Sequence, residues 1–552
     1  MIFNLDNIDM KKVNKLLPFV VLASGSLCLT GCIEETFPYG STATEEQVQE
    51  SPSATEALVM GIPAKSISVW DESTHAFFGY PANMVIRDMM TGDYCQNGGG
   101  LGYGWHFYNW SRNKSMDENK LNTQFIWNFH TGFLLSINNV ISAVNPSNAT
   151  EAQLGYRASA LAYRALVYLD LARMYEFLPN DKFTKNADGN DVTGLTVPWV
   201  TSETTPDEAA NNPRLPRAEM FAKILADLDE ALANIDKLPS TMGGTLPDKS
   251  VALGLKARLY MWVEDYPKAE EFARKAIEAA KVDPYTEDRA LSVTNGYNTA
   301  SDFMLSAQQT AESRCVTSGI INYISWVSNQ TTFGYTGPGA DLYICIDKNM
   351  YERISDTDWR KKQWLAPENS LLYGSEKLVS IKGDDLRNYL PDYASIKFRP
   401  NEGNGDDHKT GAVTAIPYMR VEEMYFIEAE AAAHQDVARG ATLINSFMTQ
   451  YRDPYYNCTL SDQDALVEEI VFQKRVELWG EGQTFFDIKR LDMSVTRGYP
   501  GTNWQDIQAR LNTNGRPAWT NYVIVVTESN NNEALRGYNN PDPTDCYDPW
   551  TE

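Results

Sequence analysis

The chain has 552 residues, of which 43% are hydrophobic and 11% aromatic, so it can bury a sizeable core and is not expected to be disordered. Its formal net charge is −25, and no cluster of Lys and Arg interrupts this acidity. Because nucleic-acid binding requires basic surface that displaces counterions from phosphates, we expect no nucleic-acid partner.

The N-terminal segment has the order of features found in a secretory signal peptide. Lysines precede an apolar run from Leu16 to Leu29, which is too short to span a membrane as a helix. The sequence Leu29-Thr30-Gly31-Cys32 resembles a bacterial lipobox, in which Cys32 is acylated and becomes the mature N-terminus. Residues 1–31 are therefore predicted to be a lipoprotein signal peptide and 32–43 a membrane tether. Whether translation starts at Met1 or Met10 stays open.

The stretch from Tyr94 to Trp110, YCQNGGGLGYGWHFYNW, combines five glycines with six aromatic residues. Glycine costs about 0.5–1 kcal/mol relative to alanine inside a regular element. The stretch therefore predicts a flexible loop that carries ring surface, rather than a buried strand or helix.

Several later segments have apolar residues at helical spacing and predict amphipathic helices. Ser250–Lys281 reads as one helix pair, and Met419–His434 with Ala438–Tyr451 as another. Each pair resembles a tetratricopeptide unit, in which two helices approach each other closely at small residues. In the last segment, Ser461 and Asp464 resemble a capping box at the helix start. The predicted segments are Glu151–Phe177, Arg217–Leu238, the pair within Ser250–Lys281, the pair Met419–His434 with Ala438–Tyr451, and Leu460–Asp492.

Residues 283–415 differ from this helical pattern, being rich in Gly, Asn, Asp, Ser and aromatic residues. Such long irregular segments usually carry function or lie near it. The patch GIINYISWV reads as a strand or a loop anchor, and it begins a second aromatic group. That group comprises Tyr323, Trp326, Phe333 and Tyr335.

The sequence gives little support to catalysis or to a bound metal or cofactor. It contains five histidines, none paired with a second ligand at metal spacing, and no nucleophile or phosphate-loop motif. Five cysteines outside the first 32 residues allow one disulfide bridge and leave at least one thiol free. The charged group Arg475, Glu477, Glu481, Asp487 and Arg490 predicts an ion network at helix ends rather than an acid–base site. A glycosidase remains conceivable, since it needs only two carboxylates about 5–10 Å apart.

Taken together, these segments resemble the SusD/RagB family of outer-membrane nutrient-binding lipoproteins. The last two segments are the most specific, although Gln473 and Thr484 stand where the family usually has an acid and an arginine. The resemblance rests on Cys32, Gln124–Ile141, Arg157–Pro179, Arg214–Leu232, Ser250–Ala280, Ile416–His434 and Glu469–Leu491.

The resemblance implies a mainly α fold, in which tetratricopeptide-like helix pairs form a scaffold with a long loop-rich, partly β insertion. Residues 32–552 would then be a single domain: the tether 32–43, the helical scaffold 44–282 with the aromatic loop 94–110, the ligand-side insertion 283–415 and the C-terminal helical part 416–552.

The resemblance also implies a cell-surface lipoprotein, anchored to the outer membrane through Cys32, that captures glycan for a SusC-like TonB-dependent barrel transporter. Peptide capture by the same scaffold, or a structural lid that binds no ligand, remain alternatives. No enzyme activity, cofactor or metal is implied. Rings that stack on sugars and amides that bind hydroxyls would come from the two aromatic regions. The predicted ligand-binding residues are Asn97, Tyr103, Trp105, Tyr108, Asn109, Trp110, Arg112, Tyr323, Trp326 and Tyr335.

Overall fold

The computed structural model describes residues 52–70, 74–99, 105–383 and 385–552, which form one compact unit. The predicted signal peptide and the predicted lipidation site, Cys32, lie outside the described residues.

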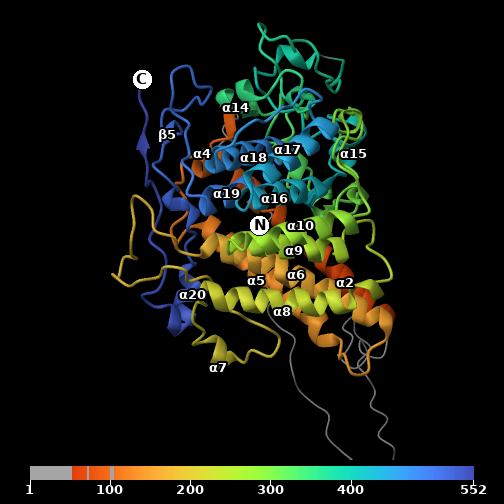
Figure 1. Ribbon diagram of the computed structural model, residues 1–552, viewed down its shortest axis with the longest axis vertical. Helices are drawn as coiled ribbons and strands as arrows, with labels where there is room; N and C mark the ends of the chain where they lie inside the picture. The colour runs from red at the N-terminus through yellow and green to blue at the C-terminus, as the bar shows by residue number, and fades with distance from the viewer. Residues whose placement is uncertain (1–51, 71–73, 100–104, 384) are drawn as a thin grey trace, which may run out of the picture. The chain divides into compact units, whose positions relative to one another are not determined.

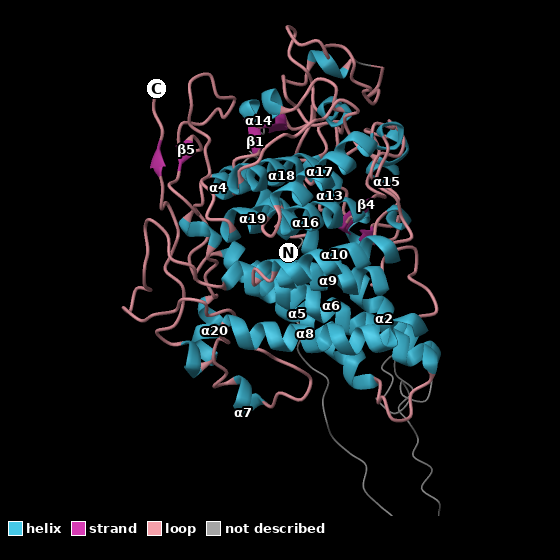
Figure 2. Ribbon diagram, viewed as in Figure 1, coloured by secondary structure: helices cyan, strands magenta, loops and turns pink. Residues whose placement is uncertain are grey.

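The described chain is mainly helical, as predicted, and its strands form small two-stranded sheets (Figure 2). The helices are α2 Pro52–Ser66, α3 Tyr80–Met89, α4 Trp105–Ser111, α5 Leu121–Ala143, α6 Glu151–Tyr175, α7 Pro206–Ala209, α8 Arg217–Asn234, α9 Lys249–Trp262, α10 Tyr266–Ala279, α11 Glu287–Ala290, α12 Arg314–Thr317, α13 Tyr323–Val327, α14 Lys348–Arg353, α15 His408–Gly411, α16 Val421–Ala433, α17 Val437–Tyr451, α18 Gln463–Glu477, α19 Thr484–Arg490 and α20 Val526–Asn531. The strands are β1 Tyr94–Gly98, β2 Leu305–Gln308, β3 Leu342–Ile346, β4 Ala415–Met419, β5 Leu511–Asn512 and β6 Asp548–Pro549.

Side-chain caps fix where several of these helices begin. The Thr150 hydroxyl accepts from the backbone N–H of Gln153, whose side chain in turn accepts from the Thr150 N–H, so α6 starts with a capping box. At α18 the cap is Asp462, which accepts from the N–H of Ala465. The predicted cap at Ser461 was therefore wrong by one residue, because a carboxylate directly after the serine fills the same role.

The long helices pack as a series in which each covers the next. Helix α5 lies on α6, α6 on α8, α8 on α9 and α9 on α10. Helix α10 then packs on α16, and α16 on α17 and α18, so the series continues across the insertion (Figure 1). Gly440 marks one close approach, because a Cβ there would lie 2.6 Å from the Cα of Ala433 on the neighbouring helix. The series buries one large apolar core and a smaller one around α17 and α18.

The insertion is anchored to the helices by strands and by a short helix. Strand β1 pairs with β3, and β2 pairs with β4, both antiparallel. The GIINYISWV patch forms helix α13 rather than a strand, and the Asn322 side chain caps it by accepting from the Ser325 N–H. Likewise, the stretch predicted to be a loop includes strand β1 and helix α4, which bury the rings of Tyr94, Phe107 and Trp110.

A buried ion cluster joins the insertion to the C-terminal helices. Glu477, 2% exposed, forms ion pairs with Arg420 at 2.6 Å, Arg452 at 2.7 Å and Arg360 at 3.2 Å. Nearby, Glu481 pairs with Lys397 at 2.6 Å and with Arg420 at 2.9 Å. The predicted ion network exists: Asp487 and Arg490 pair within α19 at 3.2 Å, whereas the partners of Glu477 and Glu481 come from more distant segments.

A second buried carboxyl, Asp88 on α3, should make stability depend on pH. Its side chain accepts the backbone N–H of Gly482 at 2.8 Å, and burial raises its pKa to about 8. Because the unfolded pKa is about 3.9, the folded state binds the extra proton between these values, and stability falls as pH rises from about 4 to about 8.

Asp88→Asn keeps the acceptor for Gly482 and removes the ionisable group. We therefore expect its melting temperature to exceed that of the unaltered protein by more at pH 8 than at pH 5.5. Circular-dichroism melts across this range test the expectation, and a difference that does not change with pH would contradict it.

Among the described residues, no helix combines the length and apolarity needed to span a membrane. The same residues contain no cluster of three or more His, Cys, Asp and Glu side chains suited to a metal ion.

Candidate ligand-binding surface

The β1–β3 pair joins the aromatic loop to the insertion. Tyr94 lies opposite Ile346, and Asn97 lies opposite Tyr343. The strand ends at Gly98, whose φ of 98° is unfavourable for other residues and whose Cβ, if present, would lie 2.3 Å from the Asp341 carbonyl oxygen. Glycine is thus required at this position because two backbones approach closely.

The rings of both segments form one cluster around Trp326 on α13. Its ring centroid lies 4.7 Å from that of Tyr335, 4.9 Å from Phe107 and 5.7 Å from Trp110. Phe78 closes the cluster at 6.1 Å. Because Phe107 and Trp110 lie on α4, this cluster fixes α4 to the insertion.

This burial corrects part of the predicted ligand set. Trp110 and Tyr323 are 1% exposed, Trp326 is fully buried and Tyr335 is 7% exposed. The Tyr323 hydroxyl donates to the Gly480 carbonyl at 3.2 Å. In this structure the four rings have almost no surface to offer a ligand. We interpret them as part of the core that stabilises the aromatic loop. The glycine-and-aromatic pattern cannot reveal which way a ring points.

The polar residues of the prediction lie nearer the surface. Asn97 and Asn109 are partly exposed. Arg112 is held by the C-terminal segment, with its guanidinium 2.5 Å from Asp506 and donating to Gln508 at 2.9 Å. Residues 505–508 thus form one side of this surface. Tyr103 lies outside the described residues, and the side chains of Trp105 and Tyr108, on α4, are likewise not described.

Exposed tyrosines of the insertion were missed by the sequence analysis. Tyr389 is 50% exposed. The pKa of its neighbour Tyr343 is raised, first by burial and then by the charges of Asp341 and Tyr389. We call Asn97, Asp341, Tyr343 and Tyr389 the tyrosine edge. All four lie within or beside regions predicted to face a ligand, but no spacing motif distinguishes these tyrosines from the other aromatics there.

A second exposed ring, Tyr373, lies in the same part of the insertion. It is 46% exposed, and the Arg387 guanidinium lies over its face at 4.1 Å from the centroid. Leu371 beside it is 88% exposed. The insertion therefore presents apolar and ring surface to solvent, which is the kind of wall found at small-molecule sites.

The chemistry that this surface offers is recognition. Half-exposed rings can stack on apolar faces, and the amide of Asn97 and carboxylate of Asp341 can hydrogen-bond hydroxyl groups. The described cysteines are free, and Cys95 and Cys345 stand opposite each other on β1 and β3. The bridge that the sequence left open is not formed, and burial raises the pKa of the Cys95 thiol well above its usual range, which makes it a poor nucleophile.

Comparison with known proteins gives one family and a set of similar folds. Residues 335–533 match the model of the SusD family. A SusD-like carbohydrate binding protein from Bacteroides vulgatus is 21% identical, with a TM-score of 0.68 over 89% of this chain and 98% of that one.

Two further solved structures have the same fold. A SusD superfamily protein from Bacteroides thetaiotaomicron is 18% identical, with a TM-score of 0.64 over 88% of this chain and 98% of that one. Surface glycan-binding protein A from Bacteroides uniformis is 15% identical, with a TM-score of 0.60 over 88% of this chain and all of that one. No curated protein matches the chain.

Proposed function

Because residues 335–533 match the model of the SusD family, we propose that the chain is a cell-surface lipoprotein that binds a nutrient glycan and delivers it to a SusC-like TonB-dependent barrel transporter. The anchor would be the acylated Cys32, and the location the outer membrane. Binding would be non-covalent, with no enzymatic step and no cofactor. Two of the similar structures are described as carbohydrate-binding or glycan-binding proteins, which favours a glycan over a peptide.

The observation that carries the proposal is the convergence of the aromatic loop and the insertion on one surface. Buried rings around Trp326 hold α4 in place, while Asp341 and Tyr389 of the tyrosine edge are exposed, Asn97 and Asn109 are partly exposed, and Tyr343 is 6% exposed beneath them. A sugar offers C–H faces that stack on rings and hydroxyl groups that hydrogen-bond to amides and carboxylates. A surface that carries both rings and these polar groups is therefore suited to bind a sugar.

A titration of the purified protein with neutral oligosaccharides and with peptides tests the proposal. We expect saturable glycan binding that Tyr389→Ala weakens by about tenfold, because one stacked, half-exposed ring contributes roughly 1–1.5 kcal/mol beyond its buried area. Intrinsic fluorescence or calorimetry gives the dissociation constants.

Tyr455→Ala is the matched control, since Tyr455 is 78% exposed but follows α17, in the C-terminal helical part. It should leave glycan affinity unchanged. Equal loss in both variants would reject the tyrosine edge as the site. Binding of peptides alone would indicate peptide capture, and stable association with the barrel without ligand affinity would indicate a structural lid.

A further inference from the structure

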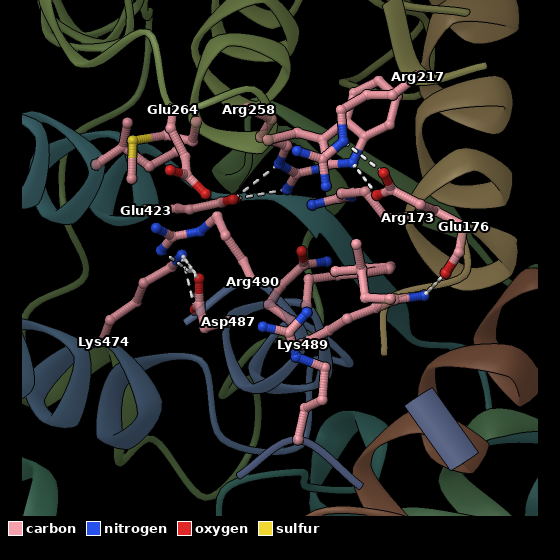
Figure 3. A pocket seen from close by; sticks show the side chains of 17 residues that line it. Arg173, Glu176, Arg217, Arg258, Glu264, Glu423, Lys474, Asp487, Lys489 and Arg490 are labelled. Atoms are coloured by element: carbon pink, nitrogen blue, oxygen red, sulfur yellow. Dashed lines mark hydrogen bonds and ion pairs between the residues drawn. The ribbon is translucent and has the colours of Figure 1, made fainter. Parts of the chain in front are cut away.

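A cavity of about 250 Å³ lies among the helices, apart from the surface described above (Figure 3). Helices α6, α9, α16, α18 and α19 contribute to its wall, together with the residues that begin α8 and follow α19. Its lining is unusually basic for a chain of net charge −25. The basic side chains around it are Arg173, Arg217, Arg258, Lys474, Lys489, Arg490 and, from the segment after α19, Arg516.

Three of the four acidic residues of the wall, Glu176, Glu423 and Asp487, are already paired with these cations. Arg258 holds Glu423 through two N–H groups, at 2.7 Å and 2.5 Å. Asp487 is paired with Lys474 at 2.9 Å and with Arg490 at 3.2 Å. The carboxylates therefore offer little attraction to a second cation, and a cationic ligand is disfavoured.

The groups that lack a protein partner are donors. Arg258 is 3% exposed, and its Nη1 has no hydrogen-bond partner in the protein. The side chain of Arg490 is 10% exposed, and its Nη1 is also without a partner, as is Nε of Arg173. Leaving a buried charged donor unsatisfied costs more than leaving a neutral one, so the cavity favours an occupant that supplies acceptors.

Lys489 has no unpartnered donor to offer an anion. Its Nζ donates to the carbonyls of Met174 at 3.1 Å, Glu176 at 2.6 Å and Thr520 at 2.8 Å, which uses all three of its donors. The ammonium thus ties α19 to the chain around α6 and to the C-terminal segment. The recognition capacity lies with the guanidinium groups.

We propose that this cavity binds a small oxyanion, the carboxylate of an acidic sugar or a phosphate, through the guanidinium groups of Arg258, Arg490 and Arg173 that line it. Guanidinium groups bind both anions through paired, charge-assisted hydrogen bonds. The volume admits a group of that size, and the half-exposed Arg217 and the exposed Glu264 place part of the wall at the solvent. The site is independent of the proposed glycan surface.

The test compares inorganic phosphate, sodium glucuronate and glucose added to the purified full chain at constant ionic strength. We expect phosphate or glucuronate to raise the melting temperature saturably and to give a calorimetric binding curve, whereas glucose does not. Phosphate alone would identify free phosphate as the source of the oxyanion, and glucuronate alone would identify an acidic sugar.

Gln483 provides a variant that changes the charge but not the size of the wall. It lines the cavity and is 6% exposed. Gln483→Glu places a carboxylate among the guanidinium groups and should weaken anion binding at least tenfold without lowering the melting temperature of the ligand-free protein. Gln483→Met, which adds no charge, should keep the affinity within about threefold.

Arg516→Gln is a second variant, because its partner Asp492 is largely exposed and its loss should leave the fold intact. It should weaken anion binding severalfold. The proposal is overturned if neither anion binds saturably to the unaltered protein, or if Gln483→Glu and Arg516→Gln both bind as tightly as the unaltered protein. The anion titrations do not measure binding of neutral glycans. If the cavity binds no anion, the glycan proposal is therefore unaffected.

Discussion

Replacing Glu477 with glutamine should lower the free energy of unfolding by about 3–5 kcal/mol, since it leaves buried charges without their partner. Arg420, Arg452 and Arg360 all pair with this carboxylate, and the side chains of all three are at most 1% exposed. Glutamine keeps the shape and one acceptor but not the charge.

The same carboxylate predicts a loss of stability in acid. Burial alone would raise the pKa of Glu477, but Arg452 and Arg420 hold it well below its usual range. A depressed folded pKa means that the stabilisation is complete above the unfolded pKa of about 4.3 and is lost as pH falls through the folded value. Glu477→Gln should therefore show a weaker acid dependence than the unaltered protein.

Urea denaturation at pH 7 measures the effect, with Glu468→Gln as the control. Glu468 pairs with Arg353 at 3.2 Å, but both side chains are exposed, so its loss should cost no more than about 0.5 kcal/mol. If Glu477→Gln were as stable as this control, the cluster could not be what joins the insertion to the C-terminal helices.

Replacing Trp326 with alanine should cost about 3–5 kcal/mol of stability, the usual range for removing a buried large ring. The ring is fully buried and contacts Phe107, Trp110 and Tyr335. Because these contacts fix α4, glycan affinity should fall together with stability rather than separately from it.

Trp326→Phe keeps an aromatic ring and should lose much less stability and much less glycan affinity than Trp326→Ala. Thermal melts and glycan titrations of the two variants make the comparison. A Trp326→Ala protein that melts normally but no longer binds glycan would show that this ring contacts the ligand, and it would contradict its assignment as a support.

The long helices could be predicted because their apolar spacing is a local property. The segment predicted as Glu151–Phe177 is α6, Glu151–Tyr175, and the pair within Ser250–Lys281 is α9 and α10. The mainly helical class was predicted for the same reason, and the segments that carry the resemblance to the SusD family are largely these helices.

The sequence predicted which regions would come together, but not which of their rings are buried. That Tyr94–Trp110 and the insertion would meet followed from the resemblance, and the β1–β3 pair brings them together. Which rings are buried depends on α4 and α13, short elements stabilised by contacts far away in sequence. Similarly, Arg475 pairs with Asp93 rather than with a neighbour on its own helix, and no local pattern contains that information.

Hydrogen exchange, measured by mass spectrometry with and without saturating glycan, tests the central claim most directly. We predict protection in residues 94–99, 105–112, 338–343, 385–390 and 503–508, which are the described part of the aromatic loop, the tyrosine edge and the C-terminal segment beside them. Protection confined to other segments, or no change at a glycan concentration that saturates binding, would contradict it.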